Sequence, residues 1–525
     1  MKRSHPSERG RGATEESGST DEDLKRQRLD DEDVSGSSGV EVGSRASEIV
    51  RDTETVRSSE ADKGSKVVAS SAVRGMKARR DCPYLSSVNR FCLDFDFQGI
   101  CRVSGSKEHV YCCLVCGEFL QGRGWNTPAM THALSQEHCL YMSLADGRVF
   151  CIPDNYEVLD ASLEDIKFNL APTYSAADVA GFRIRELYGR ALNGADYIVG
   201  LMGLNSINQS TDYANVVIQL LCKAIPFREQ LLLCDGAAKD AGAAKDAGAG
   251  NDAGAGNDAG AENAVFTKDP LVDNLQKLVK KMFNPRSFKG IASPHEFLQA
   301  CHLASKKQFT LLKRSDAHQF LVWLINYIDK KTRKNGGCNW CQGKARIESI
   351  GDSSITIKSF FCLSLNVPES PLFTSPADTI PEAHLFELLD EYGGNLTGGT
   401  TRKSIEELPE YLILHIKRFS RNNFFTEKNP TLIRFPTKDL DLSEYVEPDA
   451  LLKNPNTRYD LVCNIVHMGS AEGGYYVIYV YNAPSDQWYE VENLRIVPTE
   501  PHRVAGAPAY IQMWKRQTSS LLPQR

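Results

Sequence analysis

The sequence predicts an α+β protein in which a small cysteine-rich domain precedes a larger domain of helices and strands. Three observations support this class: a charged first segment with few large apolar residues, a Cys-x2-Cys and His-x5-His pattern within 113–138, and a change of periodicity near Ile347. Apolar residues recur every three or four positions before Ile347, as in helices, and alternate or run together after it, as in strands. The larger domain is therefore expected to begin with helices and to end in β-structure.

Composition narrows the class of protein further. A length of 525 residues suggests about two to four domains, and an apolar content of 41% is enough for globular cores. The net charge of -6 is mild and does not indicate a nucleic-acid binder along the whole chain. The 15 cysteines lack the spacing of secreted disulfide proteins, and no signal pattern or bilayer-spanning apolar run is present. We expect a soluble protein of a reducing compartment, without membrane contact, whose cysteines are metal ligands or buried thiols.

Residues 1–80 are predicted to form a disordered charged tail. They are rich in Ser, Glu, Asp, Arg and Lys, and such a segment buries too little apolar surface to offset its chain entropy. Basic clusters at 25–28 and 77–80 are compatible with nuclear import signals or with ordinary solvated charge.

The next segment, 81–175, is predicted to bind zinc. Cys113 and Cys116 form a Cys-x2-Cys turn, and His132 and His138 follow. Two thiolates on one tight turn and two histidines complete the tetrahedral shell that Zn²⁺ prefers. The alternative is a pair of buried thiols with two unrelated histidines. The remaining cysteines of this segment are expected to be core thiols, although two of them form a weak candidate for an extra site: Cys101 and Cys112.

Residues 176–197 are predicted to form a connector with a helix over 176–192. Apolar side chains just before it, among them Leu163 and Ile166, are expected to pack on the next domain. A repeat of GAAKDA and GAGNDA units fills 236–263, and its small residues predict a disordered insertion to which we assign no function.

The last domain is expected over 198–520. A helix should begin at Asp212 and run to about Lys223, with the Asp212 carboxylate as its N-cap. Helical patterns continue over 269–331, and strand patterns follow. Cys338 and Cys341 form a Cys-x2-Cys without a second pair, which argues against zinc there.

Two stretches carry a resemblance to known families. The first stretch resembles the zinc finger of ubiquitin proteases. It comprises Cys113-Leu-Val-Cys116-Gly117, then Gln121-Gly-Arg-Gly124, then Cys151-Ile-Pro-Asp-Asn-Tyr156. Some fingers of this type hold the Gly-Gly tail of free ubiquitin with an Arg and aromatic residues, and Arg123 and Tyr156 are candidates for that role. We favour a structural or protein-docking finger, because a fold alone does not give a function.

The segment 203–221 resembles the opening of the catalytic domain of ubiquitin-specific proteases, which implies a papain-like cysteine-peptidase fold. The matching residues are Gly203, Leu204, Thr211, Tyr213, Asn215 and Gln219. Asp212 stands where the family keeps its nucleophilic cysteine, and Ser210 stands where the family often has an Asn that donates to the oxyanion. The strand text Pro409–Phe419, ending Lys-Arg-Phe, also matches.

The same resemblance places Tyr475 at the position of the catalytic histidine and Glu492 at that of the third triad member. A phenol with an ordinary pKa of about 10 is a poor base at neutral pH. His467 is expected to be the only nearby imidazole, at a position that is structural in the family. Because nucleophile and base are both absent, the resemblance implies an inactive pseudo-deubiquitinase, with no catalytic residues.

The combination of such a finger with an Asp-Tyr-Ala-Asn motif is similar to the tri-snRNP-associated, ubiquitin-protease-like splicing factors. Matching text includes Ser162–Ile166, Lys417–Phe425 and Tyr510–Arg516. This resemblance implies a nuclear scaffold in pre-mRNA splicing and spliceosome assembly, with partners among tri-snRNP proteins and with snRNA contacts as a further option. Two alternatives stay open. One is a non-catalytic ubiquitin receptor, and the other is an active deubiquitinase using a thiol such as Cys222, which lies too far along the helix.

Overall fold

We describe the protein from a computed structural model, which describes residues 78–234, 269–349, 354–368, 380–393, 396–397, 401–421, 426–453 and 455–518. The expected charged tail, apart from 78–80, and the expected insertion at 236–263 lie outside these residues. No helix in the described ranges is both long and apolar enough to cross a lipid bilayer.

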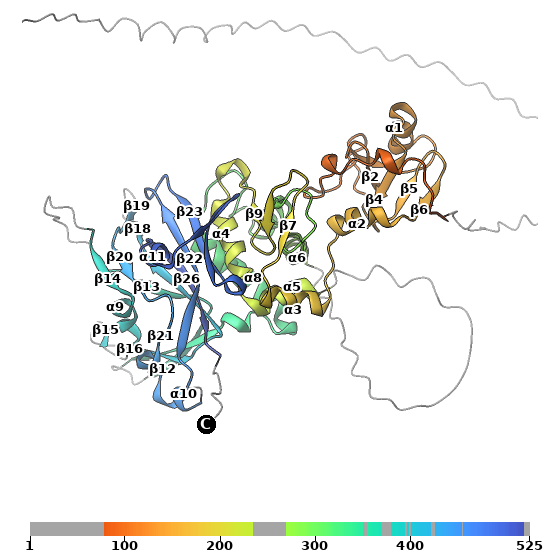
Figure 1. Cartoon of the computed structure of the whole chain (residues 1–525). Helices are drawn as coiled ribbons and strands as arrows, with labels where there is room; N and C mark the ends of the chain where they lie inside the picture. Colours follow the sequence, from red (N-terminus) through yellow and green to blue (C-terminus); the bar gives the residue numbers. More distant parts are fainter. Residues whose placement is uncertain are drawn as a thin grey trace, which may run out of the picture. The chain divides into compact units, whose positions relative to one another are not determined.

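The cysteine-rich segment folds around a six-stranded sheet in the order β1-β6-β5-β4-β2-β3 (Figure 1). Its strands are β1 (Ala78–Arg79), β2 (Val110–Cys113), β3 (Phe119–Gln121), β4 (Leu140–Ser143), β5 (Val149–Cys151) and β6 (Tyr156–Val158). Two helices accompany the sheet, α1 (Pro128–Gln136) and α2 (Glu164–Leu170). Every residue of β4 and β5 is buried, so these two strands form the centre of this small core.

Two apolar side chains of this region were expected to pack on the following domain, and this prediction is wrong. Leu163 and Ile166 are fully buried within the core of the cysteine-rich domain itself, together with Leu140, Met142 and Val149. Helix α2 therefore belongs to the core of the small domain.

The helix of the connector is shorter than the predicted helix over 176–192. Helix α3 (Ala176–Ile184) begins with a capping box between Ser175 and Asp178 and ends at Ile184. The chain then extends into a hairpin of β7 (Tyr188–Arg190) and β8 (Asp196–Ile198). Tertiary contacts override the helical pattern here, because the Glu186 carboxylate accepts hydrogen bonds from four side chains. The donors are Tyr188, Asn482, Ser485 and Tyr489.

The larger domain begins with helices, as its periodicity predicts. They are α4 (Asp212–Leu221), α5 (Ile225–Leu233), α6 (Pro270–Met282), α7 (His295–Ala304) and α8 (Ala317–Thr332), and a short parallel pair of β9 (Gly203–Leu204) and β10 (Ile291–Ala292) lies among them. Every residue of α4 is buried, so α4 is the central helix of this half. Helix α8 begins where the Asp316 carboxylate caps the Gln319 N–H at 2.8 Å.

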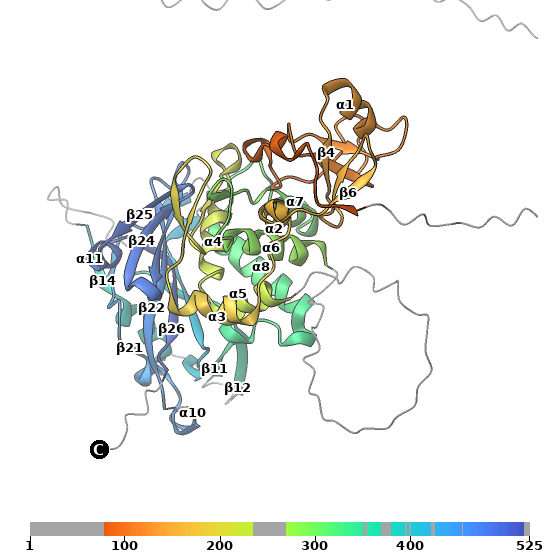
Figure 2. The same cartoon turned by 45° about the vertical axis from the view of Figure 1, so that its right-hand side comes forward.

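A large sheet forms the other half of this domain. Its strands follow the order β13-β17-β26-β22-β23-β24-β25, with β21 (Leu440–Asp441) paired to β22. They are β13 (Leu363–Asn366), β17 (Tyr411–Lys417), β22 (Arg458–Met468), β23 (Tyr475–Asn482), β24 (Gln487–Glu492), β25 (Arg495–Thr499) and β26 (Ala509–Arg516). Figures 1 and 2 show helices α4 to α8 gathered on one side of this sheet.

A second, four-stranded sheet has the order β12-β11-β16-β15. Its strands are β11 (Gly343–Ser349), β12 (Ser354–Phe360), β15 (Leu396–Thr397) and β16 (Thr401–Glu407). The remaining elements are short: β14 (Glu382–His384) with β20 (Leu432–Arg434), β18 (Phe419–Arg421) with β19 (Thr426–Lys428), and helices α9 (Leu385–Leu389), α10 (Pro448–Lys453) and α11 (Pro501–Ala505).

The alternation of side chains along β23 divides the domain into two cores. Tyr476 and Ile478 face the helices and join their core, whereas Val477 and Tyr479 join a second core on the opposite face of the sheet. Because successive strand residues point to opposite faces, the side chain that leads β23, Tyr475, points away from the helices.

Candidate functional site

Two regions of the structure gather chemically active side chains, and the first is in the cysteine-rich domain. One ligand atom from each of Cys113, Cys116, His132 and His138 lies within 4.8 Å of the others. The Cys113 Sγ is 3.6 Å from the His138 Nδ1, the Cys116 Sγ is 3.4 Å from the His132 Nε2, and the two histidine nitrogens are 3.1 Å apart. Tetrahedral zinc, with Zn–S of about 2.3 Å and Zn–N of about 2.0–2.1 Å, requires spacings of roughly 3.5 Å and 3.3 Å. The four residues therefore fit a zinc ion.

Local structure holds these four residues in place. Cys113 ends β2, and Cys116 lies in the turn before β3. Gly117 in this turn has a φ of +82°, and a Cβ there would lie 2.1 Å from the Cys92 carbonyl oxygen, so only glycine fits. His132 is on α1, and His138 follows the end of that helix.

A neighbouring carboxylate that sequence reasoning missed completes the surroundings of the cluster. The Glu118 Oε2 lies 4.0 Å from the His132 Nδ1, the ring nitrogen that faces away from the cluster. A carboxylate in that position orients a ligating imidazole and raises its basicity. The signal in the sequence was its place directly after the Cys-x2-Cys-Gly turn.

The other cysteines and the expected ubiquitin-tail residues lie elsewhere. Cys101 and Cys112 are buried, and neither belongs to a group of three potential ligands within the described residues. Arg123 lies over the Phe150 ring at 4.4 Å. Tyr156 is buried and donates its hydroxyl to the Cys82 Sγ at 3.1 Å. A role for Tyr156 in an open ligand pocket is therefore wrong, because its side chain is part of the domain core.

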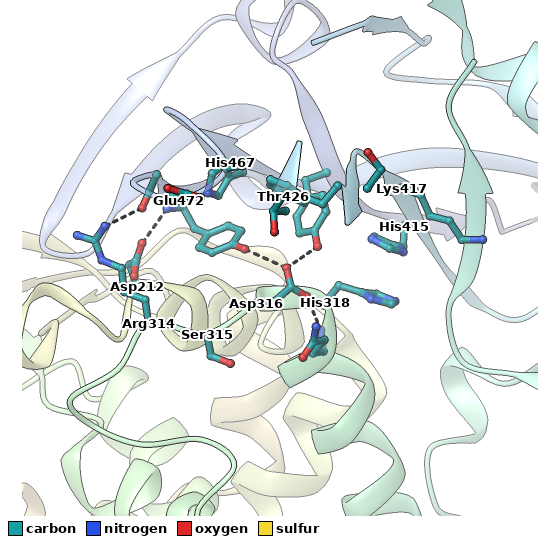
Figure 3. A pocket seen from close by; sticks show the side chains of 17 residues that line it. Asp212, Arg314, Ser315, Asp316, His318, His415, Lys417, Thr426, His467 and Glu472 are labelled. Atoms are coloured by element: carbon teal, nitrogen blue, oxygen red, sulfur yellow. Dashed lines mark hydrogen bonds between the residues drawn. The ribbon is translucent and has the colours of Figure 1, made fainter. Parts of the chain in front are cut away.

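The second region is a cleft of about 530 Å³ between the N-terminal ends of α4 and α8 and the strands of the large sheet (Figure 3). Its walls contain charged and aromatic side chains and no cysteine: Asp212, Arg314, Ser315, Asp316, His318, Gln319, His415, Lys417, Phe419, Ser420, Thr426, His467, Ala471, Glu472, Gly474, Tyr476 and Tyr510. The cleft therefore has no thiol that could act as a nucleophile.

Asp212 lies at one end of the cleft and is 5% exposed. Its carboxylate accepts a hydrogen bond from the backbone N–H of Tyr476 at 2.8 Å, across the cleft. The expectation that it caps its own helix is wrong, because the N-cap residue is Thr211 and Asp212 is the first residue of α4. Burial raises the pKa of Asp212, while the backbone N–H groups of Tyr476 and Tyr213 and the charge of Arg314 oppose the rise. The side chain is a tie between helix and sheet.

Further hydrogen bonds join the two halves beside Asp212. The Asp316 Oδ2 accepts from the Tyr476 hydroxyl at 3.1 Å and from the Tyr510 hydroxyl at 2.5 Å. Arg314 donates to the Gly474 carbonyl at 3.0 Å. Figure 3 shows these bonds running between the helix ends and the strands. Sequence reasoning missed Arg314, Asp316 and Tyr510 because each is far along the chain from its partner.

The other two expected triad positions do not line the cleft. The Tyr475 side chain is 42% exposed and points to the face of the sheet opposite Tyr476. Glu492 ends β24, and its carboxylate lies 3.8 Å from Arg495. The structure therefore brings Asp212 alone of the three into the cleft.

Three histidines line the cleft, although the sequence led us to expect only His467. The His318 and His415 rings stack with centroids 3.5 Å apart and planes 8° from parallel. Burial lowers the pKa of His415 to about 3, with a further lowering from His318 and Lys417. Burial likewise lowers the pKa of His467 to about 4. At neutral pH all three are neutral, since burial also lowers the pKa of His318.

The remaining candidate residues make contacts that stabilise the fold. Ser210 donates its hydroxyl to the carbonyls of Ile207 and Leu311, both at 3.0 Å, so that hydroxyl is already committed. Cys222 is buried at the far end of α4, and burial raises the pKa of its thiol to about 12. Cys338 and Cys341 are buried in the helical core.

Comparison with known proteins accounts for both regions. The model of the ubiquitin carboxyl-terminal hydrolase family matches residues 202–514, and that of the zinc finger in ubiquitin-hydrolases and other proteins matches residues 101–163. The chain belongs to the ubiquitin carboxyl-terminal hydrolase family. The resemblance to this family is thereby confirmed, together with the order of finger and peptidase-like fold.

Within this family the chain is similar to one numbered hydrolase and to proteins named for splicing. It is 34% identical over 474 residues to human ubiquitin carboxyl-terminal hydrolase 39, covering 83% of this chain and 80% of the relative. It is 30% identical to the probable mRNA-splicing protein ubp10 of Schizosaccharomyces pombe, covering 83% and 88%. The crystal structure of an essential yeast splicing factor superposes with a TM-score of 0.67 at 25% identity, covering 83% of this chain and all of that one. The similarity to the splicing members of the family, expected from the sequence, is confirmed.

Proposed function

We propose that this family member is a catalytically inactive scaffold that acts in pre-mRNA splicing. The observation that carries the proposal is the cleft, where the Asp212 carboxylate lies bonded to the Tyr476 N–H and no thiol lines the walls. Acyl transfer by this class of enzyme needs a thiolate, a base within hydrogen-bond reach and a group that orients the base. The aligned positions Asp212, Tyr475 and Glu492 supply none of these in a working arrangement.

The relatives suggest where such a scaffold works. Two similar proteins and one similar structure are named for splicing. We assign the chain by this similarity to the nucleus, with proteins of the spliceosomal tri-snRNP as its partners and snRNA within the particle as a further contact. We assign the finger to residues 81–175, the connector to 176–197 and the peptidase-like domain to 198–520. The finger would hold one structural Zn²⁺ through Cys113, Cys116, His132 and His138, which stabilises a docking surface.

Two assays test the proposal together. The full chain is incubated with ubiquitin carrying a fluorogenic C-terminal amide, and with a ubiquitin probe that traps thiol nucleophiles. We expect no hydrolysis and no adduct, because the position facing Tyr476 is a carboxylate. Tagged full-length protein is then recovered from nuclear extract, and its RNAs and proteins are identified. Recovery of tri-snRNP RNAs and proteins supports the scaffold, whereas recovery of ubiquitin conjugates without them replaces it with a ubiquitin receptor.

A further inference from the structure

An exposed edge strand lies in the four-stranded sheet, and none of its residues lines the cleft. Strand β12 pairs with β11 over seven residue pairs, from Ser354 opposite Ser349 to Phe360 opposite Gly343. Within the described residues no strand pairs with the other side of β12, which is the first strand of the order β12-β11-β16-β15. An edge strand presents a row of backbone N–H and C=O groups that can pair with another chain.

The side chains of β12 are unusually open for a strand of this composition. Six of its seven residues are exposed, and only Phe360 is partly buried. Ile355 and Ile357, on the same face, are 55% and 52% exposed. β-branched residues suit a pleated, half-buried surface, so the exposed Ile355 and Ile357 leave apolar area on β12 that another chain could cover.

The other end strands of the eight-stranded and four-stranded sheets are protected in ways that proteins use against unwanted pairing. β25 carries Pro498, which removes an N–H from the edge. β13 is four residues long and half of it is buried, and β15 has only two residues. β12 has no proline, and its pairing with β11 has no bulge. Lys358 is therefore the only residue of β12 that discourages pairing at this edge.

The charges around β12 indicate what would pair with it. Lys344 and Arg346 on β11 are each matched by a carboxylate, Glu407 at 2.6 Å and Glu348 at 2.6 Å. Lys358 has no carboxylate within 4.0 Å among the described residues and is exposed. A strand that lies beside β12 with a Glu or Asp near Lys358 would gain an opposite-charge pair, a favourable cross-strand contact.

A second copy of this chain is a poorer occupant. An antiparallel copy of β12 centred on Ile357 would put the two Lys358 side chains on the same face at diagonal positions, about 7–8 Å apart. Centred on Lys358, the copy would place them directly opposite each other. Like charges directly opposite each other are destabilising, and diagonal neighbours lie within reach of long side chains, whereas a strand with a carboxylate at this position places no like charge near Lys358.

We propose that β12 is a docking edge for an extended, acidic segment of a partner protein, which adds a strand to the β12-β11-β16-β15 sheet. Backbone pairing along Ser354–Phe360 would supply the affinity. Apolar side chains of the segment would cover Ile355 and Ile357, and an acidic one would pair with Lys358. The inference concerns a surface other than the cleft and does not depend on the proposed role in splicing.

Hydrogen–deuterium exchange of the full chain, read by mass spectrometry, tests this docking edge. The probe is a capped heptapeptide of alternating valine and glutamate, and the comparison peptide has lysine for glutamate. We expect the glutamate peptide to slow exchange within 354–360 about threefold when its free concentration is twice its dissociation constant, since protection follows 1 + [L]/Kd. The lysine peptide should protect far less. Two further versions of the glutamate peptide distinguish backbone pairing from other binding: one is N-methylated at the odd-numbered residues and the other at the even-numbered residues. N-methylation removes the N–H groups that would pair with β12, so at least one version should no longer slow exchange.

A charge-reversal variant sharpens this test. Lys358→Glu should reverse the preference of β12 between the two peptides, while Lys107→Glu, at an exposed lysine of the finger, should leave it unchanged. The proposal is overturned if no peptide protects β12, or if both N-methylated peptides protect as well as the parent. Protection that grows with protein concentration in the absence of peptide would also overturn it, because a second copy would then be the occupant.

Discussion

The zinc-ligand cluster and the cleft are two polar sites on one chain, and they differ in completeness. In the finger, four candidate ligands meet within 4.8 Å and a fifth side chain, Glu118, lies beside one of them. In the cleft, Asp212, which was expected at the nucleophile position, bonds to a backbone N–H, and the other two expected triad positions do not line the cleft. The difference indicates that the finger has a complete set of residues for binding a metal, whereas the cleft has the peptidase-like fold without a thiol nucleophile.

The largest expected effect is the loss of one finger ligand. Cys113→Ser should abolish zinc binding and unfold the finger, because binding energy at structural zinc sites is on the order of 10 kcal/mol and is folding energy. Metal content by mass spectrometry and limited proteolysis within 81–175 measure this. Cys92→Ser, at an exposed cysteine of the same domain, is the matched control and should leave both unchanged. Full zinc content in Cys113→Ser would show that these four residues are not the ligands.

The next prediction concerns substitutions that place a thiol and then a histidine at two of the expected triad positions. Asp212→Cys alone should stay inactive on a fluorogenic ubiquitin amide, because no base faces the new thiol and the pKa of His467 is lowered to about 4. Adding Tyr475→His should leave the rate unchanged, because the side chain at position 475 points to the face of the sheet opposite Tyr476, and a thiol is activated only by a base within hydrogen-bond reach. A higher rate in the double variant than in Asp212→Cys would show that a histidine at position 475 reaches the thiol.

A smaller effect tests Asp212 as a tie between helix and sheet. Asp212→Ala leaves the buried Tyr476 N–H without its acceptor and should lower the free energy of unfolding by about 1–3 kcal/mol. Asp212→Asn retains an oxygen acceptor and should cost less than the alanine variant. Urea unfolding of both variants at one pH measures the difference. Equal losses would mean that the hydrogen bond to Tyr476 contributes nothing to stability.

The smallest effect concerns the stacked histidines and depends on pH. Because burial lowers the pKa of His415 to about 3, the unfolded chain binds a proton that the folded chain excludes below an ordinary pKa of about 6.5. The stability due to this group is therefore present above pH ~6.5 and is lost as the pH falls, by up to about 1.4 kcal/mol per pH unit. His415→Phe, which keeps a stacked ring, should flatten the fall in unfolding free energy between pH 7 and pH 5. An unchanged slope would assign the acid sensitivity to other groups.

What the sequence could predict follows from the range of each interaction. The four candidate zinc ligands lie within 26 positions, and their spacing alone predicts a zinc site. Helices α4, α6 and α8 were predictable because their apolar residues repeat locally. The helix expected over 176–192 failed because Glu186 bonds to side chains about 300 positions away. The stacking of His318 on His415 could not be predicted either, because no residue near one of them in the sequence indicates contact with the other.

The candidate cleft shows the same limit more sharply. The resemblance to a known family singled out Asp212, but local sequence suggested that it caps its own helix. Its actual acceptor role involves a backbone N–H at Tyr476, a group that every residue except proline has and that no sequence motif marks. Only the fold could reveal that this carboxylate joins the helical half to the sheet.

Strand β26 lies between β17 and β22 in the large sheet, although it is the last strand described along the chain. A ribosome that has not yet added Ala509 has already made both neighbours, and neither can pair with the other across the empty place. Folding of this domain during synthesis must therefore wait until Ala509–Arg516 has emerged. Until then two long apolar strand edges stay open to chaperones and to other nascent chains. A chain that stops short of β26 should be degraded, because the middle of the sheet would be missing.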